Sequence, residues 1–210
     1  MFVVHAVQIP WLAMPNYFNT GEISIDKSGI KKKIEKKIKG LNTDGKITCS
    51  VSVKEGDADD VILYAAKSHK ADMIIIGAHS KSKGKKRLLG TTAQKVAHQS
   101  HLPVLIVKKS VEGNYQNILA PTDFEIQSKQ SVLFAKNIFP KAKISAIHAS
   151  EKIYIEGPYT VVGYDFAHYN DVAKACAEKN MKDFIKDVSA EKGKVIDGKL
   201  DNKKVILQYI

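Results

Sequence analysis

Short apolar runs alternate with longer polar stretches along this chain, and the clearest pattern lies near its middle. The run Met73–Ile76 is short, rich in β-branched residues and closed by Gly77, which is typical of a strand buried on both faces of a parallel sheet. Thr91 or Thr92 can then cap a helix, and the apolar run Val104–Val107 follows it. The pattern predicts a strand, a loop, a helix and a second, parallel strand.

The loop after the first of these strands has the chemistry of an anion site. In such units ligands lie beyond the carboxyl ends of the strands, where free backbone N–H groups and the positive end of a helix dipole attract anions. Gly77 and Gly90 let the backbone approach a phosphate closely. The hydroxyls of Thr91 and Thr92 can donate to its oxygens. The sequence therefore predicts a phosphate-binding loop here.

This loop resembles the nucleotide-binding signature of the universal stress protein family, which is Gly-x-x-Gly, nine residues, and Gly followed by Ser or Thr. In this chain the signature is Gly77-Ala78-His79-Ser80, nine residues, Gly90-Thr91. Ser80 thus stands in place of the second glycine and adds a Cβ to the loop. The resemblance implies the α/β class, with parallel doubly wound sheets in the adenine nucleotide α-hydrolase-like fold of universal stress proteins.

The resemblance also implies a function, which is binding of ATP or AMP, with or without Mg²⁺, in a regulatory stress-response role. The implied nucleotide-binding residues are Val7, Gly77, His79, Ser80, Gly90, Thr91 and Thr92. Val7 ends an earlier predicted strand, Phe2–Val7, and is expected to line the base or ribose. His79 either donates to a phosphate or is solvated.

An internal repeat extends the resemblance over nearly the whole chain. The matching pairs are His5-Ala6 with His148-Ala149, and Asp57 with Asp201, at offsets of 143 and 144 residues. Two unrelated segments that share nearly one offset predict tandem copies. We place the copies at residues 1–109 and 116–210.

Both copies are expected to be incomplete. The first lacks the family's first strand and helix, and the second stops within its third helix. Since the family's sheet order is 3-2-1-4-5, the first copy lacks the strand that joins its two halves. Three interpretations follow. The chain is a fragment of a longer tandem protein, or it is a degenerate relic. Alternatively, the two copies form one composite sheet, in which the strands of Ile118 and Ile75 are neighbours.

Thr122 and Asp123 end the predicted first strand of the second copy. The family places an Asp beside the nucleotide at this point, so the resemblance implies a second nucleotide contact. The alternative is that Asp123 caps a helix starting near Glu125. The second copy has no glycine loop of its own.

The net charge of +11 comes mostly from lysines in two clusters, Lys27–Lys39 and Lys81–Arg87. In the first cluster Ile30, Ile34 and Ile38 recur at helical spacing, which predicts an amphipathic helix with a solvated lysine face. The second cluster lies in the phosphate loop, where it either attracts phosphates or forms a basic surface loop. We do not expect a nucleic-acid partner, because the sequence shows neither a recognised binding module nor aromatic residues among these lysines.

The sequence carries no recognised catalytic motif. Gly84-Lys85-Lys86 lacks the Ser or Thr that completes a P-loop, and neither Gly-x-Ser-x-Gly nor His-Glu-x-x-His occurs. We therefore expect no catalytic residues, no metal site and at most slow ATP hydrolysis. No apolar run approaches the length of a membrane span, so a cytoplasmic protein without a membrane partner is expected.

A second function stays open. Some members of the resembled family lack the glycine signature and do not depend on ATP. Ser80, in place of the second glycine of the signature, makes this chain more similar to those members. The alternative is a nucleotide-independent interaction protein of the same fold. It would dimerise through the last strand of the first copy, Val104–Val107.

Overall fold

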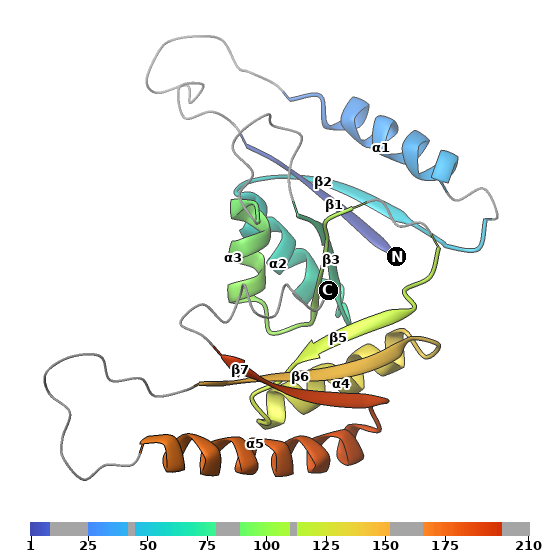
Figure 1. Cartoon of the computed structure of the whole chain (residues 1–210). Coiled ribbons are helices and arrows are strands. Elements are labelled where there is room, and N and C mark those ends of the chain that lie inside the picture. The colour runs from blue at the N-terminus through green and yellow to red at the C-terminus, as the bar shows by residue number, and fades with distance from the viewer. Residues whose placement is uncertain (9–24, 42–44, 79–88, 110–112, 152–165, 199–210) are drawn as a thin grey trace, which may run out of the picture. The chain divides into compact units, whose positions relative to one another are not determined.

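The computed structural model describes residues 1–8, 25–41, 45–78, 89–109, 113–151 and 166–198 (Figure 1). The chain divides into two compact units, Met1–Ser110 and Val111–Ile210. In both units the described strands are parallel and alternate with helices. The predicted α/β class is therefore confirmed.

The first unit alternates strands and helices. Its elements are β1 (Phe2–Val7), α1 (Lys27–Leu41), β2 (Ser50–Glu55), α2 (Ala58–Ser68), β3 (Ile74–Gly77), α3 (Thr91–Gln99) and β4 (Val104–Val107). Strand β1 pairs with β2, and β3 pairs with β4, both in parallel. No strand within the described ranges joins the two pairs.

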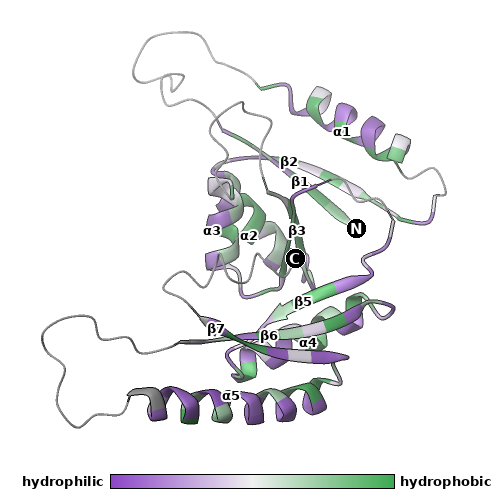
Figure 2. Ribbon diagram, in the orientation of Figure 1, coloured by the Kyte–Doolittle hydropathy of each residue, from purple (hydrophilic) through white to green (hydrophobic). Residues whose placement is uncertain are grey.

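The helices of the first unit pack on these strand pairs. Helix α1 contacts β2, α2 contacts β1 and α3, and α3 contacts β4. The buried apolar residues of the two adjacent helices are small, with Ala65 on α2 and Ala93 and Val96 on α3, which lets the helices approach closely. In Figure 2 α1 is largely hydrophilic, whereas β3 is hydrophobic.

The second unit is a three-stranded parallel sheet covered by two helices. Its elements are β5 (Asn117–Pro121), α4 (Ile126–Ile138), β6 (Lys143–Glu151), α5 (Phe166–Val188) and β7 (Lys192–Gly198), and the sheet order is β5-β6-β7. Helices α4 and α5 pack against each other, and α5 lies on β6 and β7. The buried core cluster is Val132, Ile144, Ala146, Met181, Phe184 and Val188.

A glycine permits the close packing of α5 on β7. A Cβ at Gly193 would clash with the side chains of Met181 and Ile185 on the facing helix. Glycine therefore suits this point of the strand because a helix passes directly over it.

The composite sheet proposed from the sequence stays a prediction, because it would join two separate units. Ile75 lies on β3, which pairs with β4, and Ile118 lies on β5, which pairs with β6. Neither β3 nor β5 has a further partner among the described strands. A parallel pairing needs a crossover of a dozen or more residues, and residues 108–116 between β4 and β5 are a short span for one.

Two element boundaries differ from the prediction. The sequence also predicts a strand over Lys46–Val53, whereas β2 spans Ser50–Glu55, because β1 begins opposite Ser50, at Phe2. Helix α5 begins at Phe166 rather than near Lys174. The helical apolar spacing of α5 extends into these first turns through Phe166, Tyr169 and Ala173, a signal that the prediction overlooked. None of the helices in the described ranges is both long and apolar enough to cross a membrane.

Candidate functional site

Ala78 and Gly90 lie on either side of the predicted phosphate loop, and a backbone hydrogen bond joins them. Ala78, which follows β3, donates its N–H to the carbonyl of Val107 at 2.8 Å. The carbonyl of Ala78 accepts a hydrogen bond from the N–H of Gly90, also at 2.8 Å. Ala78 is buried. These bonds hold the start of α3 at the carboxyl end of β3, directly after Gly77, where βαβ units bind their ligands.

The N-terminus of α3 carries N–H groups that the helix does not use. Gly90 is the N-cap residue, with φ −70° and ψ 153°, and no side chain caps the helix. The first helical hydrogen bond runs from the N–H of Gln94 to the carbonyl of Gly90 at 3.0 Å. The N–H groups of Thr91, Thr92 and Ala93 thus have no partner in the described part of the chain. With no acidic residue in the first turn, this helix end favours an anion.

Val7 ends β1, which belongs to the other strand pair of this unit. Its carbonyl accepts a hydrogen bond from the N–H of Gly56 at 3.1 Å. The adjacent Gln8 donates its side-chain amide to the carboxylate of Asp57 at 2.7 Å. These two bonds tie the end of β1 to the start of α2. The predicted site residues therefore lie at the carboxyl ends of two strands, with Val7 on one and the glycine loop on the other.

An ion pair between α2 and α3 connects these two regions, and sequence reasoning missed it. Nζ of Lys95 lies 3.1 Å from Oδ2 and 3.3 Å from Oδ1 of Asp59. The Asp59 side chain is 11% exposed, in the first turn of α2, and Lys95 lies one turn beyond Thr91. The two residues are 36 positions apart, so no local sequence pattern marks them as partners.

The ion pair shifts the pKa values of Asp59 and Lys95 in the directions that favour the charged form of each group. The hydrogen bond from Lys95 is the main cause that holds the pKa of Asp59 below its ordinary value of 3.8. The same hydrogen bond raises the pKa of Lys95 above its ordinary value of 10.5. Lys95 is the lysine of α3, and its ammonium group is already paired with Asp59. Anion binding at the start of α3 thus depends on backbone N–H groups and the helix dipole.

Thr122 and Asp123 follow β5 in the second unit and make local hydrogen bonds. The hydroxyl of Thr122 accepts a hydrogen bond from the N–H of Phe124 at 2.9 Å. The carboxylate of Asp123 accepts one from the N–H of Glu125 at 3.0 Å and one from the hydroxyl of Ser128 at 2.6 Å. The bond from Ser128 is the largest cause that lowers the pKa of Asp123. These bonds form a turn before α4, whose N-cap residue is Glu125 and whose start has no side-chain cap hydrogen bond.

Part of the predicted site lies outside the described residues. His79, Ser80 and the basic cluster Lys81–Arg87 all fall between residues 78 and 89. Their proposed contacts stay predictions. Over the ranges that the structure does describe, no three or more His, Cys, Asp or Glu residues gather in a way that could hold a metal ion.

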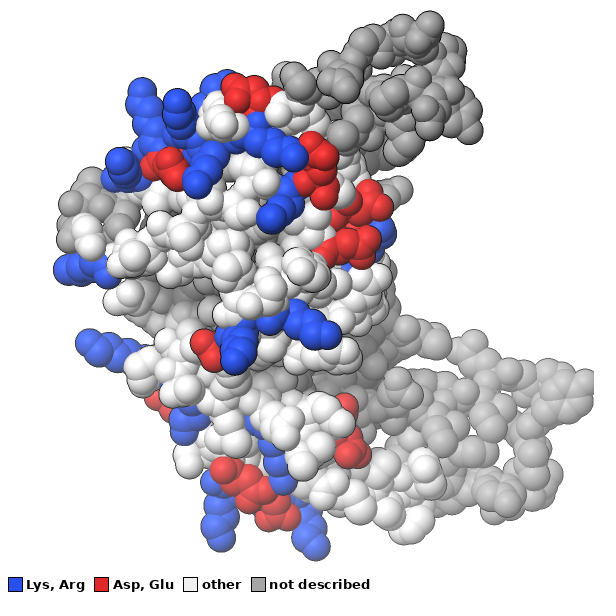
Figure 3. Space-filling model, turned by 180° about the vertical axis from the view of Figure 1, so that it is seen from behind, with Lys and Arg blue, Asp and Glu red and all other residues white. Residues whose placement is uncertain are grey.

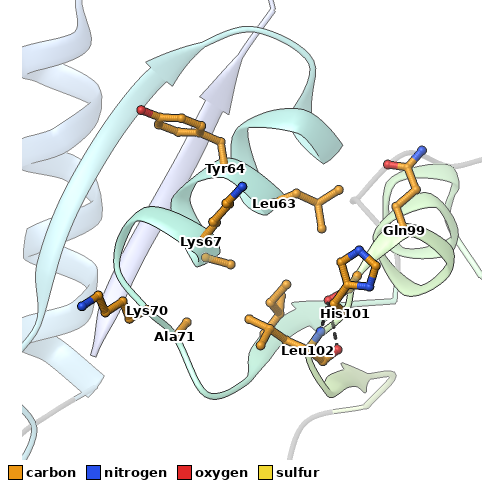
Figure 4. A pocket seen from close by; sticks show the side chains of 11 residues that line it. Leu63, Tyr64, Lys67, Lys70, Ala71, Gln99, His101 and Leu102 are labelled. Carbon is orange, nitrogen blue, oxygen red and sulfur yellow. Dashed lines mark hydrogen bonds between the residues drawn. The ribbon is translucent and has the colours of Figure 1, made fainter.

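A cavity of about 530 Å³ lies in the first unit near the start of β3, at the other end of the strand from Gly77 (Figure 4). Its lining is mainly apolar and includes Leu63 on α2, Ile74 at the start of β3 and Leu102 after α3. Lys67 and His101 are also among the lining residues. Among the predicted nucleotide-binding residues that the structure describes, none lines this cavity.

Comparison with known proteins places the chain in a family. Residues 1–108 match the model of the universal stress protein family. A universal stress protein from Methanocaldococcus jannaschii is 34% identical over 74 residues, which cover 35% of this chain and 44% of that protein. Stress response protein NhaX from Bacillus subtilis is 36% identical over 58 residues, which cover 28% and 35%. The matched part thus spans less than half the length of either relative.

Solved structures agree on the fold. A universal stress protein from Archaeoglobus fulgidus superposes with a TM-score of 0.61 at 20% identity, covering 99% of this chain and 69% of that one. A functionally unknown protein from Pseudomonas aeruginosa PAO1 gives a TM-score of 0.57 at 14% identity, covering 94% and 74%. Because the family match extends over residues 1–108 of 210, the chain belongs to the universal stress protein family.

Proposed function

We propose that this chain binds an adenine nucleotide, ATP or AMP, through its first unit, and that this binding serves a regulatory stress-response role. The observation that carries the proposal is the start of α3, where the N–H groups of Thr91, Thr92 and Ala93 have no partner among the described residues. Gly77 and Gly90 lie on either side of the loop, where a phosphate can come close to the backbone.

In this proposal the loop residues bind the phosphates and β1 contributes to the rest of the nucleotide. Thr91 and Thr92 donate from their hydroxyls as well as their backbone. Val7 is half-buried at the end of β1 and lines the base or ribose. Binding rather than turnover is expected, since the sequence supplies no recognised catalytic motif, and any ATP hydrolysis is slow. The first turn of α3 has no carboxylate, so Mg²⁺ would arrive with the nucleotide.

The test is calorimetric titration of the 210-residue chain with ATP and Mg²⁺, beside the variant Gly90→Val. Any L-residue tolerates the backbone angles of Gly90, so the variant is expected to fold while its side chain blocks the approach of a phosphate. Gly40→Val on α1 is the matched control, because a Cβ there has no atom within 4 Å. We expect binding in the wild type and the control, and its loss in Gly90→Val.

A second candidate is the nucleotide-independent interaction protein. It is supported by β4, whose outer edge has no partner among the described strands, since β4 pairs with β3 alone. Such an edge can pair with the same edge of a second copy. This candidate is favoured if the titration gives no heat while circular dichroism shows a folded chain and light scattering shows a dimer.

A further inference from the structure

Helix α1 concentrates the positive charge of the chain. Its 15 residues hold seven lysines and one glutamate, a net charge of +6 out of +11 for all 210 residues. Figure 3 shows lysine side chains gathered over α1, at the upper left of that view. The first unit therefore presents one strongly cationic helix.

Most of the lysines of α1 have no ion-pair partner among the described residues. Lys27 pairs with Glu55 at 2.8 Å, and Lys31 lies 3.9 Å from Glu35. The other five lysines of α1 are exposed and have no ion-pair partner within the described ranges. These five residues, which we call the lysine face, are Lys32, Lys33, Lys36, Lys37 and Lys39.

The central row of the lysine face, which is Lys32, Lys36 and Lys39, points away from the strands. Ile30, Ile34 and Ile38 are half-buried, and α1 contacts β2. At 100° per residue this row lies on the opposite side of the helix from these isoleucines. With a rise of about 1.5 Å per residue, the three lysines follow one another at about 6 and 4.5 Å along the axis. The result is a short linear array of cations.

We propose that the lysine face docks on the phosphate backbone of a nucleic-acid duplex. A duplex carries one negative charge per about 1.7 Å of its axis, so a row of lysines can replace several of its counterions at once. The proposal does not depend on nucleotide binding by the loop after β3.

The residue types on α1 favour a duplex over other polyanions. Single strands are bound by aromatic side chains that stack on bases, and α1 has no aromatic residue. The lysines of α1 can therefore contact only the phosphate backbone of a nucleic acid. Helices that lie in a membrane surface insert their apolar side, whereas the isoleucines of α1 face β2. The absence of aromatic residues, for which the sequence alone disfavoured nucleic acid, argues only against single strands.

The test measures the affinity of the full chain for a fluorescein-labelled, mixed-sequence DNA duplex of about 20 base pairs over a range of salt concentrations. The variant is Lys32→Gln/Lys36→Gln/Lys39→Gln. Lys141→Gln/Lys179→Gln/Lys182→Gln is the matched control, since these lysines are exposed in the second unit and the charge change is the same. Glutamine and lysine have similar helix propensities, and circular dichroism checks the fold.

We expect the control to bind much like the wild type. The lysine-face variant should bind more weakly, and the slope of log K against log salt should become shallower by about 0.9 for each phosphate that the helix no longer neutralises. Replacing the same three lysines by arginine should retain binding. Equal weakening in the variant and the control would overturn the proposal, and so would binding of phosphatidylserine vesicles without binding of the duplex.

Discussion

Asp59 and Lys95 show how two side chains can set the geometry of the candidate site. Asp59 lies in the first turn of α2 and Lys95 in the middle of α3, and their ion pair joins the two helices. The Asp59 side chain is 11% exposed, so its charge is largely removed from water and depends on the lysine. Loss of either charge should therefore loosen α3 relative to α2.

The pKa shifts give this ion pair a pH dependence at both ends of the scale. The pKa of Asp59 is lowered, so its contribution to stability is present above its ordinary value of 3.8 and is lost as the pH falls through the folded-state pKa. The pKa of Lys95 is raised, so its contribution is present below 10.5 and is lost as the pH rises through the folded-state value. Both groups contribute fully between these limits.

Asp59→Asn should lower the melting temperature by a few degrees at neutral pH. The difference from the wild type should shrink as the pH is lowered below 3.8, because Asp59 then loses its charge in the wild type as well. Thermal unfolding followed by circular dichroism measures both effects. Asp60→Asn is the control, since it removes the same charge from the exposed side of the same turn. An equal loss in both variants would show that the ion pair contributes nothing specific.

At the scale of elements, α5 determines the core of the second unit. Phe184 is 1% exposed and belongs to a cluster with residues of α4 and β6, and its ring meets that of Phe124 edge to face, with centroids 6.1 Å apart. Phe184 thus packs with Met181 and Val188 of the same helix to join α5 to the other elements of this unit.

Phe184→Ala should destabilise the second unit by about 3–5 kcal/mol, the usual cost of deleting a buried aromatic side chain. Chemical denaturation followed by far-ultraviolet circular dichroism measures the change. Leu133→Ala on α4 is the control, because Leu133 is 49% exposed and its removal leaves no buried cavity. A similar effect of both substitutions would contradict the assignment of Phe184 to the core.

The sequence predicted the elements that carry a complete local signal. The expected strands Phe2–Val7 and Val104–Val107 are β1 and β4. The start of β2 was missed because it depends on which residues β1 places opposite it, and that is not a local property. The glycine loop was recognised from its spacing. The Asp59–Lys95 pair was not, because it depends on how two distant helices meet.

At the scale of the whole molecule, the two units differ in how their sheets are completed. In the second unit β6 has a strand on each side, whereas in the first unit each strand of a pair has one described partner. A two-stranded sheet is marginal unless other elements support it. The strands of the first unit should therefore open more readily than β6.

Native-state hydrogen exchange can compare the two units in one sample. We expect the amides of β6 to be protected more strongly than those of β3, after correction for intrinsic exchange rates, because opening β6 breaks two ladders. The variants Asp59→Asn and Phe184→Ala provide internal checks that the amide exchange rates report the opening of the strands. Slower exchange in β3 than in β6 would contradict this ranking.

The parallel pairing of every described strand has a consequence for the order of folding. Partners lie far apart along the chain, from 26 residues between Asn117 and Lys143 to 48 between Phe2 and Ser50. No tight turn brings two of these strands together, so no hairpin of the described strands can serve as a nucleus. Such distant pairings slow folding, because a long loop must close before they form. Helix formation in the connecting segments is therefore the local event that precedes each strand pairing.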